Sequence, residues 1–125
     1  MTGKDMASAG SQGFPRQVRL GGNRNYRYVY RKGKSYPSRN LTLVYFRGRG
    51  VRVGFSVSSK VGNAVTRNHI RRLMREDVRK ILSTMKDGRY IFVARPSAKG
   101  TAHEKLTGEI MSVLRRAGLL AEAEQ

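Results

Sequence analysis

Alternation of apolar and polar side chains is clearest between Val51 and Ser58. One side of an extended chain would carry the apolar residues Val51, Val53, Phe55 and Val57, and the other would carry Arg52, Gly54, Ser56 and Ser58. Successive side chains of a strand point to opposite faces. The pattern therefore predicts a strand with one face in the core and one small, polar and basic face, which suits close approach by a phosphate backbone.

Two further strands are predicted. The segment 41–47 is rich in residues typical of strands, and 48–50 (Gly-Arg-Gly) is expected to form a hairpin connection to the strand at 51–58. An Asp87-Gly88 turn introduces a third strand at 90–94, which ends at Arg95-Pro96.

The longest predicted helix runs over about 64–84, with Asn63 as its N-cap. At ~100° per residue its apolar side chains share one arc, and these are Ile70, Leu73, Met74, Val78 and Ile81. Asp77 falls inside this apolar arc. The spacing alone does not explain a carboxylate there.

Two shorter helices flank this middle part. One is expected at 24–32, with Asn23 as N-cap and Gly33 just after its end, followed by a turn-like segment at 34–38. The last helix is expected to follow Thr101, which forms a capping box with Glu104, and to stop at Gly118. Its inward residues are Leu106, Ile110, Val113 and Leu114.

The order of elements is α-β-β-α-β-α, which predicts an α+β fold, a single-domain α/β sandwich over residues 14–120. Residues 1–13 are rich in Gly, Ser and Ala and lack periodicity, so they are expected to form a disordered N-terminal tail. Residues 121–125 form a C-terminal tail.

Composition restricts the partners. The 125 residues carry 26 Lys and Arg against 8 acids, a net charge of +18. A transmembrane helix needs ~20 mostly apolar residues, and no such run is present. The first residues lack the apolar region of a secretory signal, and the absence of Cys fits a reducing cytosol. Composition alone leaves nucleic acid, an anionic membrane or an acidic protein as partners. Because aromatic residues are interleaved with the arginines, we favour nucleic acid and expect a cytoplasmic protein with no membrane or small-molecule partner.

The positive charge is concentrated in the first two thirds of the chain. Residues 14–80 contain 18 basic side chains and only Glu76 and Asp77 as acids. Arg67, Arg71, Arg75 and Arg79 are spaced by four, so they form a row on the longest helix. Like charges in such a row repel, and phosphates would neutralise them. The row predicts a nucleic-acid contact; a plain solvated basic face is the alternative.

Aromatic residues alternate with basic ones in the first helix. Tyr26 and Tyr30 share a face, while Tyr28 points elsewhere. Aromatic rings among arginines can stack on unpaired bases, at ~1–3 kcal/mol per base. A pair of tyrosines sealing a small helix onto the sheet is an equally good interpretation.

No catalytic site is apparent in the sequence. His69 and His103 lie on different predicted helices and have no neighbour of metal-binding or catalytic type, so we interpret His69 as an RNA contact or a surface residue. There is no Ser/His/Asp arrangement, no HExxH and no P-loop.

The segment Phe55–Glu76, with Arg67-Asn68-His69 followed by Arg71-Arg72 and Arg75-Glu76, resembles the signature of the bacterial ribonuclease P protein component. The helix that precedes it, with its aromatic and basic residues, also resembles that family. The likeness spans residues 14–120.

The resemblance implies a sandwich with a left-handed βαβ crossover, which is an exception to the usual handedness. It implies a non-catalytic subunit that assists a catalytic RNA, with Mg²⁺ held mainly by that RNA, in removing the 5′ leader of precursor tRNA. RNA-binding residues by position would be Arg67, Asn68, His69, Arg71, Arg72, Arg75 and Lys60. The cleft that holds the leader would be lined by Tyr26, Tyr30, Val44, Arg52 and Ser56.

The sequence departs from the family pattern at several positions. His69 replaces an Arg, Ser59 replaces a Lys, and Tyr26 and Tyr30 replace Phe. Val44 offers contact but no ring. A general RNA-binding scaffold of the ribosomal type and a self-sufficient nuclease remain as alternative functions.

Overall fold

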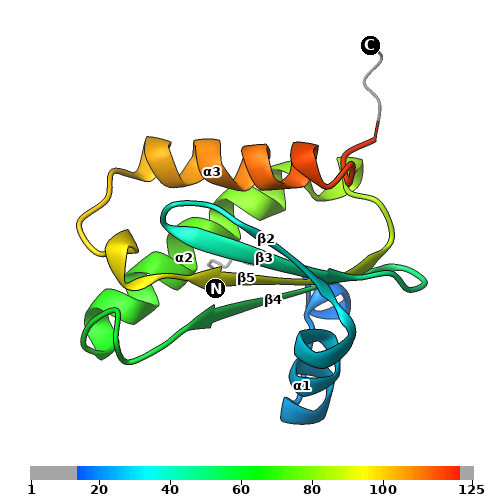
Figure 1. The fold of residues 1–125 in the computed structure, drawn as a ribbon, viewed down its shortest axis with the longest axis horizontal. Helices are drawn as coiled ribbons and strands as arrows, with labels where there is room; N and C mark the ends of the chain where they lie inside the picture. Colours follow the sequence, from blue (N-terminus) through cyan, green and yellow to red (C-terminus); the bar gives the residue numbers. More distant parts are fainter. Residues whose placement is uncertain (1–13, 122–125) are drawn as a thin grey trace, which may run out of the picture.

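The computed structural model describes residues 14–121, whose α+β fold is a four-stranded mixed sheet with helices on both faces (Figure 1). The elements in chain order are η1 (Arg16–Val18), α1 (Asn23–Lys32), β2 (Lys34–Pro37), β3 (Leu41–Phe46), β4 (Val51–Val57), α2 (Ala64–Ile81), η2 (Leu82–Thr84), β5 (Gly88–Ala94), η3 (Pro96–Ala98) and α3 (His103–Arg116). The predicted tail at 1–13 and residues 122–125 lie outside the described residues.

The sheet order is β2-β3-β5-β4. β3 pairs antiparallel with β2 and β5, whereas β4 pairs parallel with β5, and α2 connects these two parallel strands. The predicted hairpin between β3 and β4 is therefore wrong, because β5 is inserted between them. The Gly48–Gly50 spacing only indicates a turn, and it cannot predict that β5, which begins at Gly88, will pair with both strands.

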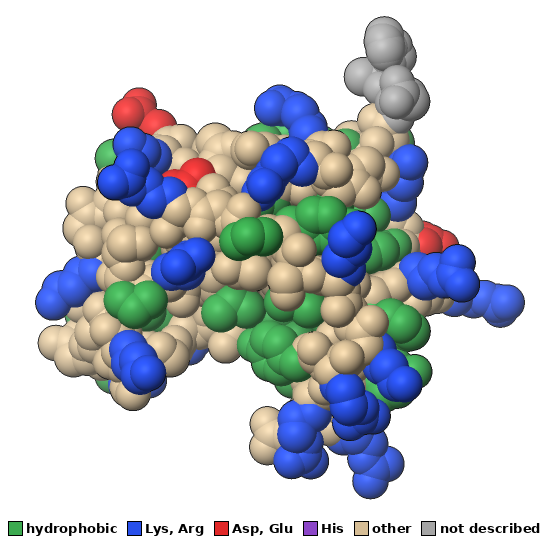
Figure 2. Space-filling model, viewed as in Figure 1, with side chains coloured by type: hydrophobic (Ala, Val, Ile, Leu, Met, Phe, Trp, Pro, Cys, Tyr) green, Lys and Arg blue, Asp and Glu red, His purple; other side chains and the backbone are tan. Residues whose placement is uncertain are grey.

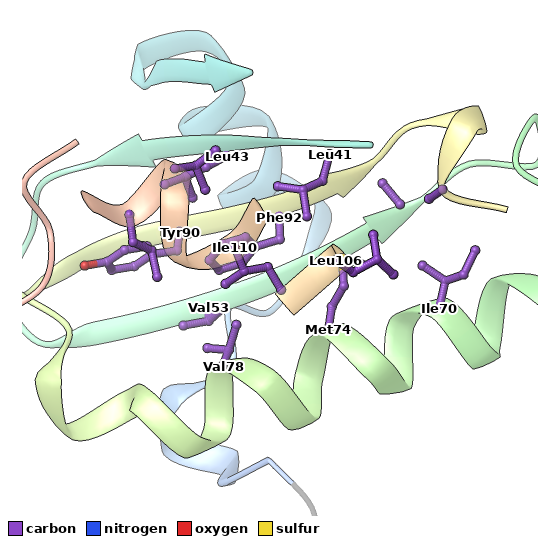
Figure 3. Packing of buried hydrophobic residues seen from close by; sticks show 14 of the residues in the cluster. Leu41, Leu43, Val53, Ile70, Met74, Val78, Tyr90, Phe92, Leu106 and Ile110 are labelled. Atoms are coloured by element: carbon purple, nitrogen blue, oxygen red, sulfur yellow. The ribbon is translucent and has the colours of Figure 1, made fainter. Parts of the chain in front are cut away.

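One face of the sheet packs against α2 and α3 and forms the main hydrophobic cluster (Figure 3). The predicted alternation in β4 is confirmed, since Val53 and Val57 are buried and Val51 and Phe55 pack against the same cluster. The apolar arc of α2 also faces inward through Ile70, Met74 and Val78, as does that of α3 through Leu106, Ile110, Val113 and Leu114. Burying these side chains stabilises the domain by roughly 1.5–3 kcal/mol each.

The opposite face of the sheet is covered at one end by α1, which Figure 1 shows on the other side of the strands from α3. Leu20, Val29, Val44 and Ile91 form a second, smaller buried cluster there. Gly33 ends α1 and lies so close to β3 that an added Cβ would be 2.9 Å from the Tyr45 carbonyl oxygen. Glycine is needed at this position for close approach, and not for a left-handed backbone, since its φ is −81°.

Three local predictions are corrected by the structure. Residues 34–37 form the edge strand β2 instead of a turn, so the order is α-β-β-β-α-β-α. Gly22 caps α1, and Asn23 is already helical. Ala102 caps α3, while the Thr101 hydroxyl donates to the Ser97 carbonyl oxygen at 2.8 Å. The N-cap of α2 is confirmed, because the Asn63 side chain accepts from the Thr66 N–H at 2.9 Å.

Asp77 is 7% exposed, and the structure explains its place in the apolar arc of α2. The Thr107 hydroxyl donates to its Oδ2 at 2.9 Å, and the His103 Nε2 lies 3.1 Å from its Oδ1. The carboxylate therefore joins α2 to α3. Among residues 14–121, no helix combines the length and the apolar character that crossing a membrane requires.

Candidate nucleic-acid interface

The arginines of α2 form a continuous basic face that lies beside the sheet. Asn63 caps the start of the helix. Arg67, Arg71 and Arg75 follow in one row, because residues four apart are neighbours on a helix. A surface hollow of about 530 Å³ lies along this face. It is lined by Val65, Asn68, His69, Arg71, Arg72 and Arg75.

Hydrogen bonds within the helix orient several of these side chains. The Arg67 Nε donates to the Gly62 carbonyl oxygen at 3.1 Å, and the Arg71 Nη1 donates to the Asn68 Oδ1 at 2.8 Å. Arg72 and His69 face each other, with Nη2 and Nδ1 3.3 Å apart. The structure thus brings together the predicted run from 67 to 75, and Lys60 lies exposed in the loop that precedes it.

Carboxylates do not neutralise this face. Within residues 14–121, the single salt bridge joins His103 to Asp77, on the side of α2 that faces α3. Burial lowers the pKa of the half-buried Arg75, and the charges of Arg71 and Arg19 lower it further. Close positive charges of this kind attract a polyanion.

A cleft of about 230 Å³ lies where α1, β4 and α2 meet. Its lining residues are Phe14, Arg19, Leu20, Tyr26, Val53, Gly54, Phe55, Arg71 and Arg75. Tyr26 reaches across the sheet face to Gly54, where an added Cβ would lie 2.6 Å from its Cζ. Burial raises the pKa of the Tyr26 hydroxyl, while a hydrogen bond from the backbone of Phe55 opposes that rise.

The remaining predicted cleft residues occupy different places. Tyr30 is 44% exposed and lies beside Tyr26, with ring centroids 6.5 Å apart. Ser56 is half-buried on the α1 face of β4. Val44 is only 6% exposed, within the second cluster, so little of its side chain is available to a ligand.

Arg52 is not brought next to Ser56. These residues are about 13 Å apart along β4, at ~3.3 Å per residue, and Gly54 lies midway under Tyr26. The Arg52 Nη1 donates to its neighbour's carbonyl oxygen, that of Val51, at 3.0 Å. Arg52 therefore belongs to the opposite end of the sheet face.

Arg19 lines the cleft but is absent from the predicted site. It pairs with Val53 in an isolated parallel bridge, and its Nη2 donates to the Phe14 carbonyl oxygen at 2.8 Å. That pairing spans more than thirty residues of sequence, so no local spacing could have placed Arg19 beside Arg75.

Metal ligands are not clustered in the described part of the chain. Within residues 14–121, no three His, Asp or Glu side chains are grouped so that they could hold a metal ion together. The basic face and the cleft offer hydrogen-bond donors and aromatic surface, which suit phosphates and bases.

Known proteins resemble this chain over most of its length. A family model described as Ribonuclease P matches residues 14–118. The ribonuclease P protein component of Finegoldia magna is 38% identical over 104 residues, which cover 82% of this chain and 92% of the relative. That of Clostridium novyi is 40% identical over 107 residues, with 81% and 94% covered.

Solved structures show the same fold. The RNase P protein of Staphylococcus aureus superimposes with a TM-score of 0.78 at 30% identity, and the match covers 82% of this chain and 97% of that one. The Thermotoga maritima protein, at 21% identity, has a TM-score of 0.71 over 78% of this chain and 96% of its own, and shows the likeness of fold alone. The chain belongs to the family of ribonuclease P protein components, the protein subunits of the endoribonuclease ribonuclease P.

Proposed function

We propose that the α2 basic face binds the catalytic RNA of ribonuclease P and that the cleft beside it holds the 5′ leader of precursor tRNA. The observation that carries this proposal is the position of the α2 arginines directly beside the Tyr26 cleft, with Arg71 and Arg75 lining both. A single polynucleotide surface would thus connect the two RNAs.

The α2 face would contact phosphates. Arginine presents a planar fork of donors that matches phosphate oxygens, and each phosphate contact releases about one counterion. Arg72, Asn68 and His69 are exposed and reach outward from the helix, so they are the first to meet an RNA helix.

The cleft would contact the leader. Tyr26 and Tyr30 offer aromatic surface for unpaired bases. The Tyr26 ring packs against the backbone of Gly54 in β4, and this contact fixes the ring before a ligand arrives. Ser56 adds a hydroxyl donor farther along the same sheet face.

The chain's own residues would bind and position RNA. Mg²⁺, held in this proposal by the RNA subunit, would supply the activated water and stabilise the charge of the cleaved phosphodiester. The protein would raise the local affinity for the precursor and lower the Mg²⁺ concentration that cleavage needs, since its cations replace part of the neutralisation.

The decisive experiment compares the affinity of the reconstituted holoenzyme for precursor tRNA and for mature tRNA. We expect tighter binding of the precursor and a lower Mg²⁺ requirement than with the RNA alone. Equal affinity for both tRNAs would favour the general RNA-binding scaffold. Cleavage by the stringently purified protein without RNA would establish the self-sufficient nuclease.

Loss of both Arg67 and Asn68 side chains tests the RNA-binding face directly. The Arg67→Ala/Asn68→Ala variant should assemble more weakly with the catalytic RNA. Arg115→Ala removes one exposed positive charge from α3 and serves as the control. Assembly of the double variant with wild-type affinity would contradict the proposal.

A further inference from the structure

A second aromatic and basic site lies on the same sheet face, next to the cleft described above. Tyr28, two residues from Tyr26 and Tyr30, lies on a different side of α1 and is 43% exposed. Its ring packs edge-on against Phe46 of β3, with centroids 5.4 Å apart and an interplanar angle of 82°. The Arg31 guanidinium lies over the same ring, 5.7 Å from its centroid.

Tyr28 borders a cleft of about 290 Å³. The lining residues are Leu20, Asn25, Tyr28, Val29, Phe46, Arg47, Gly48 and Arg89. Arg89 is held in place there, because its Nη1 donates to the carbonyl oxygens of Arg49 and Gly50 at 3.0 Å each. A guanidinium fixed by backbone acceptors keeps its other donors for a ligand.

Charge at this cleft is of one sign. The sequence contains no Asp or Glu from Phe14 to Arg75, which includes α1, β3 and the loop that follows β3. Asp87 is the acid nearest to Arg89 in the sequence. Its charge helps to raise the pKa of Tyr45 and Tyr90, after burial, and both tyrosines pack in the main cluster. Figure 2 shows Lys and Arg side chains gathered over α1 and over the loop between β3 and β4.

This cleft shares Leu20 with the one described above, and all its other lining residues are different. Sheet register places Phe46, Arg89 and Arg52 in one row across the strands, and places Thr42, Val93 and Ser56 in a row four residues away along each strand. Tyr26, over Gly54, stands between these rows. An RNA segment held at Ser56 therefore does not reach Arg89 without passing α1.

We propose that Tyr28, Arg31, Arg47 and Arg89 form a second RNA-binding site, the Tyr28 site, which holds an unpaired nucleotide and its flanking phosphates. The exposed ring stacks on the base and the arginines contact the phosphates. Sealing α1 onto the sheet does not require this arrangement, since Val29 already does so at 2% exposure. The inference rests on the proposed function, and the nucleotide comes from the catalytic RNA or from the precursor.

Removal of the ring tests the stacking. Tyr28→Ala should weaken binding of at least one of the two RNAs about 5- to 150-fold, the range that one stacked base gives, whereas Tyr28→Phe should bind as the wild type does. Arg47→Glu keeps the ring and reverses an exposed charge, so it should also weaken binding. Arg115→Ala on α3 is the control.

Two controls distinguish a misfolded variant from one that has lost binding, and a wrong site from a wrong proposed function. Each variant is checked by circular dichroism and thermal unfolding before binding is measured. If the wild type itself fails to bind the catalytic RNA, the proposed function is wrong. If the wild type binds and both Tyr28→Ala and Arg47→Glu retain its affinity for both RNAs, the Tyr28 site alone is wrong.

The source of the nucleotide is identified by cross-linking. The chain contains no Cys, so a photoreactive aryl azide can be attached at one introduced thiol. Gly48→Cys places the thiol in the cleft, and its Cβ would be in van der Waals contact with Arg89 at 3.5 Å. Gly108→Cys on α3 is the matched control, because an added Cβ there has nothing within 4 Å. Cross-links from 48 but not 108 support the site and name the RNA, while equal cross-linking from both would overturn it.

Discussion

The ring of Tyr26 lies against the backbone of Gly54, so closely that no side chain fits between helix and strand. A Cβ at position 54 would be 2.6 Å from Cζ and 2.9 Å from Cε2 of the tyrosine. The φ of Gly54 is not positive, so its backbone would accept any residue. Space alone demands glycine there.

Gly54→Ala should therefore displace Tyr26. We expect a loss of about 1–3 kcal/mol in the free energy of unfolding, as for other overpacked sites, and weaker binding of precursor tRNA. Urea unfolding and equilibrium binding measure the two effects.

A double-mutant cycle provides the control for this prediction. In a Tyr26→Ala background the added methyl group has room, so Gly54→Ala should then cost much less. An equal cost in both backgrounds would show that the collision with Tyr26 is not the cause.

Asp77→Ala should destabilise the domain without weakening RNA binding. The change removes the acceptor that Thr107 and His103 share. The Thr107 hydroxyl keeps the His103 carbonyl oxygen at 3.0 Å, so the loss is about 0.5–1.5 kcal/mol for each hydrogen bond. Urea unfolding measures the loss, and assembly with the catalytic RNA is the second readout. Reduced assembly of a folded Asp77→Ala protein would contradict this structural role.

Glu109 makes the domain less stable as the pH falls into the acid range. Burial would raise the pKa of this carboxyl, but hydrogen bonds from the Asn40 backbone N–H, the Ser38 hydroxyl and the Asn40 amide, helped by Lys105, lower it below the ordinary 4.5. A carboxyl with a lowered pKa in the folded state stabilises that state above the unfolded pKa. This stabilisation is lost as the pH falls from about 4.5 through the folded pKa.

Glu109→Gln should accordingly flatten the stability profile below about pH 4.5, the ordinary Glu value. The free energy of unfolding, followed by urea titration at several pH values, checks this. Ser112→Ala, an exposed change on the same helix that removes no ionisable group, should leave the acid limb as steep as in the wild type.

Arg72→Ala should reduce the salt dependence of binding to the catalytic RNA. Arg72 is exposed on the α2 face, and the loss of one phosphate contact reduces the slope of log K against log salt by about 0.7–0.9. Filter binding between low and moderate salt gives the slope. Arg115→Ala on α3 should leave it unchanged, and an unchanged slope for Arg72→Ala would remove that residue from the interface.

Sequence patterns predicted the elements that carry strong periodicity. The apolar arc of α2, its Asn63 cap and the alternation in β4 depend on local spacing, and each is confirmed. The arginine row followed directly from that helix, because residues four apart share a face whatever the rest of the fold does.

Features that depend on distant partners were missed. β2 is short, polar and ends in proline, and it is a strand because β3 supplies its hydrogen bonds. Alternation predicts that Arg52 and Ser56 share a face of β4, but it does not predict the ring of Tyr26 between them, which comes from α1. Asp77 became intelligible only when α3 brought His103 and Thr107 to it.

Phe14 packs edge-on against Phe55, with ring centroids 5.5 Å apart, and lines the cleft together with Tyr26. An affinity tag or fluorophore that replaced residues 1–13 would thus be tethered at the mouth of that cleft. Ala121, which follows α3, donates its backbone N–H to the carbonyl oxygen of Thr84, the last residue of η2. Labels for single-molecule or pull-down work therefore belong at the carboxyl end of the chain.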